Sequence, residues 1–229
     1  MTDVHNSGDQ QRFVDRWDAG RQLADRMEAL IDGEDAVVLA LPRGGVPIGF
    51  EVAARLGAPL DILLVRKLGV PWQPELAFGA IATGDVVVLN DDHIHALGIG
   101  SDVVKDMIER EHLEIERREH LYRNGDGPVD VTGRTVVVVD DGIATGSTMR
   151  AALECLSKRG VARRIVATPV AAEETIRALR EEADEVVCLS VPLAFSAVGM
   201  WYDDFTPVSD DEVKDLLERA ATELAEARG

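Results

Sequence analysis

The sequence contains few cysteines, few aromatic residues and no long apolar run. Cys155 and Cys188 are too few for a disulfide framework and lack metal-ligand spacing, so we expect buried free thiols. No run approaches the roughly 18 apolar residues that suggest a membrane-spanning helix. The polar N-terminal residues also lack a signal-peptide pattern. We therefore expect a soluble, cytoplasmic protein without a membrane partner.

Positive charge is also scarce. The chain has 24 basic residues against 42 acidic ones, which gives a formal net charge of -18. This balance argues against a nucleic-acid partner, because phosphate backbones require a cationic surface. Only four of the basic residues are lysine. Strong acidity with little lysine indicates a protein solvated at high salt; the alternative is an ordinary acidic protein with arginine-rich codon usage.

One run of the sequence combines a strand, a loop and a helix start. Residues 135–150 read T-V-V-V-V-D-D-G-I-A-T-G-S-T-M-R. The consecutive valines predict a strand buried in a parallel sheet, and a helix is expected over Met149–Lys158. A small-residue loop at a helix N-terminus suits a phosphate dianion, whereas Asp140 and Asp141 suit hydroxyl groups or a divalent cation. Together these groups indicate a phosphorylated sugar; the alternative is an Asp-rich turn.

The run V-V-V-V-D-D-G-I-A-T-G-S-T resembles the phosphoribosyl-diphosphate (PRPP) motif of type I phosphoribosyltransferases. The resemblance implies that Asp140 and Asp141 are catalytic, bind the ribose hydroxyls and hold a Mg2+ ion, either directly or through water. The implied 5′-phosphate loop consists of Ala144, Thr145, Gly146, Ser147 and Thr148. The run contains neither G-K-[ST] nor G-x-G-x-x-G, so it does not indicate ATP hydrolysis or dinucleotide binding.

A second turn, P-R-G-G, follows the predicted strand Ala36–Leu41. Gly44 and Gly45 allow a ligand to approach the backbone, and Arg43 supplies a guanidinium group. The turn resembles the pyrophosphate loop of the same family, especially of its bacterial guanine/xanthine members. The resemblance implies a diphosphate site and a cis peptide between Pro42 and Arg43. The alternative is a tight strand–helix turn with a surface arginine.

Arg66 and Lys67 follow the next predicted strand, Leu60–Val65. In the family a flexible catalytic loop begins here, and Lys67 resembles its diphosphate-contacting basic residue; we assign Arg66 to the diphosphate as well. A lid of this kind keeps water from an oxocarbenium-like centre. Pro71 and an exposed Trp72 are expected in the lid, and Gly84-Asp85 predicts a hairpin turn after it.

The rest of the chain alternates between helix and strand patterns. Helices are predicted over residues 12–31, 48–56, 173–182 and 210–228, and strands over 164–170 and 185–189. The alternation predicts an α/β fold, an open, mainly parallel sheet with helices on both faces. Ligand loops should gather at the carboxyl ends of its strands. We expect a single domain over residues 1–229, with a core at about 36–189.

Residues 90–123 are predicted to form a helical insertion capped at Ser101-Asp102. Its many Glu and Arg residues indicate a solvated face with i,i+4 pairs; the alternative is a projecting dimerisation helix, and we expect a homodimer. Four histidines of this region have no zinc-site spacing and are expected at the surface: His93, His95, His112 and His120.

Aromatic residues gather beyond the last predicted strand, in residues 190–208. Type I enzymes have a variable hood over the nucleobase here, so Phe195, Trp201 and Tyr202 are candidates to stack on a base. The alternative is a small core under the C-terminal helix, which we favour for Phe205. The hood and C-terminal helix are expected at about 190–228.

The resemblance implies transfer of the 5-phosphoribosyl group from PRPP to a nucleobase-like acceptor, with release of diphosphate. The acceptor is left open, because Ala144 stands where many 6-oxopurine enzymes have an aspartate, whereas P-R-G-G favours those enzymes. The alternative is a regulator that senses PRPP or a nucleotide on the same fold. A sugar-phosphate hydrolase has little support, because no histidine accompanies either anion loop.

Overall fold

A computed structural model describes residues 12–31, 33–70, 73–123 and 127–228. Five parallel strands form its main sheet, in the order β2-β1-β6-β7-β8. The strands are β1 (Ala36–Ala40), β2 (Leu60–Ile62), β6 (Thr135–Val139), β7 (Arg163–Val170) and β8 (Glu185–Ser190). Every residue of β1 and β6 is buried, as expected for apolar strands covered on both faces.

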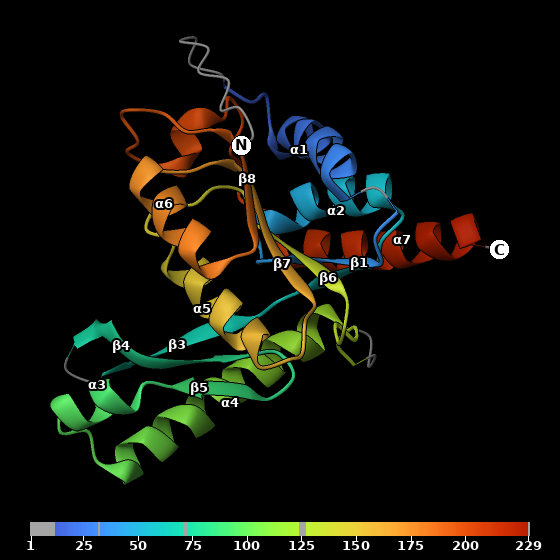
Figure 1. Cartoon of the computed structure of the whole chain (residues 1–229). Helices are drawn as coiled ribbons and strands as arrows, with labels where there is room; N and C mark the ends of the chain where they lie inside the picture. Colours follow the sequence, from blue (N-terminus) through green and yellow to red (C-terminus); the bar gives the residue numbers. More distant parts are fainter. Residues whose placement is uncertain (1–11, 32, 71–72, 124–126, 229) are drawn as a thin grey trace.

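Helices cover both faces of this sheet (Figure 1). One face carries α1 (Arg16–Ile31) and α2 (Gly45–Leu56); the other carries α5 (Ser147–Ser157) and α6 (Glu173–Glu182). The β-branched residues of β6 alternate between the two cores, with Val137 and Val139 under α1 and α2 and Val136 and Val138 under α5 and α6. The predicted fold class is confirmed, although α2 begins at Gly45 rather than at residue 48.

A second, antiparallel sheet consists of β3 (Val65–Val70), β4 (Gln73–Ala82) and β5 (Val86–Leu89). The predicted strand Leu60–Val65 is therefore confirmed only over its first three residues, and its predicted end is wrong. β2 ends at Ile62, and buried Leu63 and Leu64 carry the chain from one sheet to the other. Arg66 and Lys67 lie within β3 rather than in a loop, whereas Pro71 and Trp72 lie outside the described residues. The hairpin turn at Gly84-Asp85 is confirmed, with Asp85 at φ 59°.

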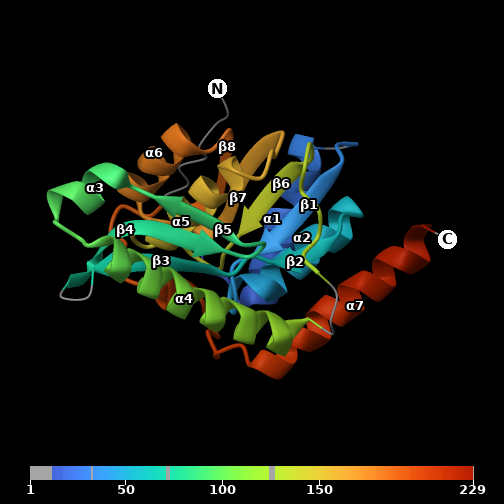
Figure 2. The same cartoon turned by 90° about the horizontal axis from the view of Figure 1, so that it is seen from below.

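The predicted insertion contains two helices, α3 (Asp91–Ala96) and α4 (Ser101–Tyr122). Figure 2 shows α4 lying across the small sheet, against which it buries Val104, Met107 and Ile115. Ser101 is its first helical residue and Gly100 its N-cap, so the predicted cap is displaced by one residue. Of the four histidines, three are exposed, and His112 is half-buried beside Asp85 and Glu116.

The C-terminal helix α7 (Asp210–Arg228) packs on α2 and α4 and buries only Val213 and Leu216. Tyr122, at the end of α4, donates a 2.5 Å hydrogen bond to Asp210 at the start of α7. Within the described ranges, no helix combines the length and hydropathy needed to cross a membrane. Both cysteines are free, as predicted, although Cys188 is half-buried rather than buried. Burial raises the pKa of each thiol to about 12.

Candidate active site

Two loops meet where the strand order of the main sheet reverses. The chain passes from β1 to β2 on one side, whereas β6, β7 and β8 follow on the other side of β1. In open α/β sheets ligands bind at such a switch point, beyond the carboxyl ends of the strands. The loop after β1 contains Arg43, Gly44 and Gly45, and the loop after β6 begins with Asp140 and Asp141. The structure therefore brings the two predicted anion loops together.

The absence of side chains on Gly44 and Gly45 permits this approach. A Cβ atom on Gly44 would lie 1.9 Å from Oδ2 of Asp141, and one on Gly45 would lie 2.6 Å from the carbonyl oxygen of Val139. The amide of Leu41 also donates to the Val139 carbonyl, at 2.8 Å. The Pro42–Arg43 peptide is cis, as the resemblance implied. Arg43 is half-exposed, with its guanidinium 3.8 Å from Asp210.

The acidic pair is held asymmetrically. Asp140 accepts a 2.9 Å hydrogen bond from the backbone amide of Asp141. Asp141 forms an ion pair with Arg16 of α1, whose Nε and Nη2 lie 2.8 and 2.7 Å from Oδ2. Burial raises the pKa of Asp140 well above its usual range, and the charge of Asp141 adds to the rise. Burial also raises the pKa of Asp141, although Arg16 opposes that rise.

Arg16 is a site residue that the sequence did not reveal. It lies in the predicted helix of residues 12–31, and its side chain is only 9% exposed. One arginine among several charged residues of α1 carries no local signal of burial. Only the packing of α1 against the sheet places it beside a residue 125 positions away.

The predicted phosphate loop surrounds the start of α5. Gly146, its N-cap, has φ 71°, and a Cβ there would lie 2.6 Å from a methyl group of Thr175. Thr175 donates a 2.5 Å hydrogen bond to the carbonyl of Ala144 and so fixes the loop to α6. Among the described residues, no side chain caps this helix start. The first backbone N–H groups of any helix have no intrahelical acceptor, and here no described side chain supplies one. These N–H groups are therefore suited to bind an anion.

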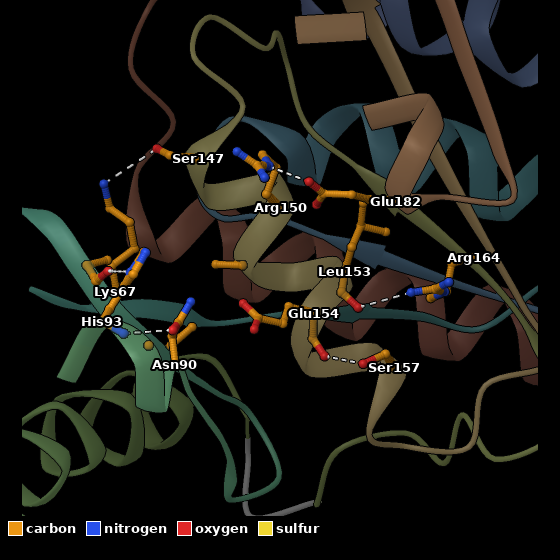
Figure 3. Close-up of a pocket in the computed structure, with 14 residues that line it drawn as sticks. Lys67, Asn90, His93, Ser147, Arg150, Leu153, Glu154, Ser157, Arg164 and Glu182 are labelled. Carbon is orange, nitrogen blue, oxygen red and sulfur yellow. Dashed lines mark hydrogen bonds and ion pairs between the residues drawn. The ribbon is translucent and has the colours of Figure 1, made fainter. Parts of the chain in front are cut away.

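Lys67 and Arg66 face opposite sides of β3, because successive side chains of a strand alternate. The ammonium of Lys67 lies 3.5 Å from the hydroxyl of Ser147, across the mouth of the phosphate loop (Figure 3). Arg66 instead donates a 2.8 Å hydrogen bond to Glu111 of α4. The structure therefore brings Lys67 to the loop and leaves Arg66 on the far face of the strand.

A pocket of about 570 Å³ extends from Ser147 along α5 (Figure 3). Its basic residues are Lys67, Arg150 and Arg164, and its carboxylates include Glu182, which lies 2.6 Å from Arg150. Arg164 lies 3.7 Å from Asp184. Lys67 has no carboxylate partner among the residues whose side chains are described. It is therefore the pocket cation best suited to meet an incoming anion at the loop.

The predicted hood lies over the acidic motif, with Trp201 and Tyr202 buried and Phe195 and Phe205 half-buried. Val198, in the 3-10 helix η1 (Val198–Trp201), lies so close that a Cβ on Gly142 would be 2.3 Å from it. Tyr202 packs against Phe13 and Phe205, with ring centroids 5.5 and 5.1 Å away, and donates a 2.6 Å hydrogen bond to the carbonyl of Asp141.

This arrangement separates the three stacking candidates. Trp201 and Tyr202 are buried in a small cluster with Phe13 and Ala19, which corresponds to the small-core alternative, although the cluster forms beside α1 rather than under α7. Phe195 is half-buried at the edge of the cluster. It is the candidate of the three that keeps the most accessible surface for a planar ligand.

Comparison with known proteins agrees with this geometry. Residues 15–204 match the phosphoribosyl transferase domain family. The chain belongs to this family. It is 50% identical over 216 residues to Rv0571c of Mycobacterium tuberculosis, a protein named as a candidate phosphoribosyl transferase; the match covers 94% of this chain and 48% of the relative. The chain thus spans about half the length of that relative.

Two further relatives extend the comparison. The crystal structure of TT1426 from Thermus thermophilus has a TM-score of 0.83 and 42% identity, covering 91% of this chain and 98% of the other. The Bifunctional protein PyrR of Chloroflexus aurantiacus is 35% identical over 126 residues, which is 54% of this chain and 63% of the relative. The family resemblance drawn from the PRPP motif is therefore confirmed.

The donor set at the acidic pair bears on the predicted magnesium ion. Among the described residues, no cluster of three or more histidine, cysteine or acidic side chains forms a metal site. The two adjacent carboxylates, Asp140 and Asp141, fit the kind of site in which Mg2+ takes one or two protein ligands and completes its shell with substrate phosphates and water. With only two carboxylates here, a magnesium ion would need further oxygen ligands from a bound phosphate compound or from water.

Proposed function

We propose that the protein transfers the 5-phosphoribosyl group from PRPP to a nitrogen of a nucleobase-like acceptor and releases diphosphate. The observation that carries the proposal is the junction at the switch point, where Gly44 of the diphosphate loop lies against the carboxylate of Asp141. A phosphate loop, hydroxyl acceptors and a diphosphate loop there match the three polar parts of PRPP in their order along the molecule.

Each group has a proposed task. The N–H groups of residues 144–148 bind the 5′-phosphate, Asp140 and Asp141 accept hydrogen bonds from the ribose hydroxyls, and Arg43, Gly44 and Gly45 bind diphosphate. Lys67 approaches from the second sheet and adds positive charge at the phosphate loop. Mg2+, when bound to the carboxylates and the substrate, supplies neutralisation of the diphosphate oxygens.

In the reaction the bond between C1 of the ribose and the diphosphate oxygen breaks, and diphosphate leaves with the electron pair. A bond forms between C1 and the acceptor nitrogen, which loses its proton to solvent or to the leaving group. The protein contributes position, charge neutralisation and exclusion of water from C1. We assign the exclusion of water from C1 to the hood and to the β3–β4 segment.

A regulator on the same fold is the second candidate. The match to a relative named bifunctional supports it, as does the burial of Trp201 and Tyr202, which leaves few aromatic surfaces for an acceptor base. Such a protein would bind PRPP or a nucleotide without turnover. The acceptor base, the homodimer and the cytoplasmic location stay predictions.

The test is calorimetric titration of the protein with PRPP and Mg2+, followed by a panel of purine and pyrimidine bases with release of diphosphate monitored. We expect saturable binding and release of diphosphate with one class of base. Binding without release for every base would support the regulator, and no binding would contradict both. The variant D140A/D141A, which removes the acidic pair, should lose PRPP binding.

A further inference from the structure

Arg16 joins three segments that are far apart in the sequence. Its Nε and Nη2 contact Oδ2 of Asp141, and its Nη1 donates a 2.8 Å hydrogen bond to the carbonyl of Thr206. The guanidinium carbon lies 3.9 Å from the ring centroid of Phe205 and 6.0 Å from that of Tyr202. One side chain of α1 thereby connects the acidic motif after β6 to the hood.

Arg16 and Gly44 enclose the carboxylate of Asp141 on the side of Oδ2. Oδ2 lies against Gly44, accepts a hydrogen bond from Nε of Arg16 and forms an ion pair with Nη2, and the side chain of Asp141 is 14% exposed. The backbone carbonyl of the same residue accepts the hydrogen bond of the Tyr202 hydroxyl. In the described part of the chain, no other side chain donates a hydrogen bond to Oδ1.

These contacts determine what the removal of Arg16 would change. A buried carboxylate without its cation beside a second carboxylate is costly, so Asp141 would turn away from Gly44 toward water. Thr206 and Phe205 would lose a hydrogen bond and a cation–π contact at the same time. The orientation of the acidic pair and the placement of the hood therefore depend on one guanidinium group.

We propose that Arg16 is a positioning residue that orients the Asp141 carboxylate for the phosphosugar and fixes the hood segment, residues 203–208, over it. The ligand assignment rests on the proposed function, whereas the effect on the hood does not. The polar contacts of Arg16 are with Asp141 and Thr206, and not with the residues that we expect to bind the phosphate groups. Arg16 would therefore act through Asp141 and Thr206. Its role is a property of the contact between α1 and the active site of this chain.

The test compares Arg16→Gln and Arg16→Lys with the control Arg12→Gln. Arg12 is a half-exposed arginine that also contacts the hood, through the carbonyl of Tyr202 and Asp203, but not the acidic pair. Two quantities are measured: the Kd for PRPP with Mg2+, and the hydrogen-exchange rate of the backbone amides in residues 203–208. The lysine variant keeps the charge and guards against a glutamine variant that does not fold.

We expect Arg16→Gln to weaken PRPP binding at least tenfold and to accelerate exchange in residues 203–208 at least tenfold. Arg16→Lys should recover part of both effects, and Arg12→Gln should stay within twofold of the wild type in PRPP affinity. In a double-mutant cycle, Arg16→Gln combined with Asp141→Asn should weaken binding no further than the more severe single variant.

Several results would overturn the proposal: wild-type affinity and exchange in Arg16→Gln, effects equal to those of Arg12→Gln, or additive losses in the cycle. A wild-type protein that fails to bind PRPP would contradict the proposed function instead. The exchange comparison would then still decide the positioning role, because unchanged protection of residues 203–208 in Arg16→Gln refutes it without any ligand.

Discussion

Gly44 determines how closely the diphosphate loop approaches the acidic pair. Its missing side chain leaves the space that Oδ2 of Asp141 occupies, since a Cβ would lie 1.9 Å from that oxygen. The requirement is steric, because Gly44 itself has φ -62°, which any residue adopts. Alanine can adopt this backbone conformation and adds no charge, so Gly44→Ala tests the steric requirement of the junction.

We predict that Gly44→Ala lowers the free energy of unfolding by about 1–3 kcal/mol, the usual cost of an inserted methyl group. It should also weaken PRPP binding by at least about tenfold, because displacement of Asp141 costs the binding energy of one good hydrogen bond. Denaturant titration and calorimetry measure the two effects. The control is Gly100→Ala, where a Cβ meets nothing within 4 Å; equal behaviour of the two variants would contradict the prediction.

The strand β3 divides its two basic residues between two tasks. Lys67 faces the phosphate loop, whereas Arg66 faces α4 and forms an ion pair with Glu111, which is 7% exposed. The alternation of a strand imposes this division. The second sheet is thus linked to the main site by one residue and to the helical insertion by its neighbour, and the two links can be broken separately.

For the first link we predict that Lys67→Ala weakens binding of PRPP with Mg2+ by about tenfold, because one charge-assisted contact is lost. Stability should change little, since the described structure gives Lys67 only a 3.5 Å contact with Ser147. Lys105→Ala is the matched control, as Lys105 is an exposed lysine of α4. Unaltered affinity in Lys67→Ala would place the lysine outside the binding site.

For the second link we predict a pH-dependent effect of Arg66→Gln. Burial raises the pKa of Glu111, but hydrogen bonds from Arg66 and Arg110 outweigh it and hold the pKa below its usual value. A lowered pKa contributes stability above pH 4.5, and this contribution is lost as the pH falls through the folded-state pKa. Removal of Arg66 should therefore cost about 1 kcal/mol at neutral pH and less in acid.

Chemical denaturation of wild type and Arg66→Gln at several pH values measures this difference. Arg117→Gln is the control, because Arg117 pairs with Glu114 on the exposed side of α4 and should cost well under about 1 kcal/mol. A cost for Arg66→Gln that stays constant from neutral to acid pH would show that Glu111 is not the partner that matters.

The net charge of -18 acts on the whole molecule. Many basic residues are already paired with carboxylates, for example Arg55 with Glu28 and Arg134 with Asp35, so the excess negative charge lies on surfaces without compensating cations. At moderate ionic strength, salt largely screens the repulsion between exposed charges that are more than roughly 8–10 Å apart. Higher salt shortens this distance, so closer charges are screened as well. The folded state, in which these charges are closest together, gains most from the screening.

We therefore predict that the midpoint of thermal unfolding rises as sodium chloride increases from millimolar to molar concentration. Scanning calorimetry across that range measures it. A midpoint that is the same in low and high salt would contradict the high-salt hypothesis and favour the alternative of an ordinary acidic protein. A parallel series with a neutral osmolyte distinguishes charge screening from the stabilisation that any solute gives when it is excluded from the protein surface.

Local patterns were sufficient to predict the main sheet and to single out the two loops that meet at its switch point. The valines of β6, the acidic pair and the small-residue loop are contiguous, so their roles depend on neighbouring residues. The glycines of P-R-G-G signal a close approach for the same reason. The break between β2 and β3 was missed because Leu63 and Leu64 are as apolar as a buried strand, and only their positions show that they connect two sheets.

The sequence by itself determined the family and the α/β fold, because these depend on short-range periodicity and on motifs that are continuous in the chain. The ligand chemistry that the motif implies for residues 140–148 stays a prediction. The tertiary structure decided which charged residues serve the site. Arg16 enters it, Arg66 turns away, and Tyr202 bonds to the acidic motif instead of lying open. The direction of a side chain depends on the packing of distant elements, and no local pattern encodes that packing.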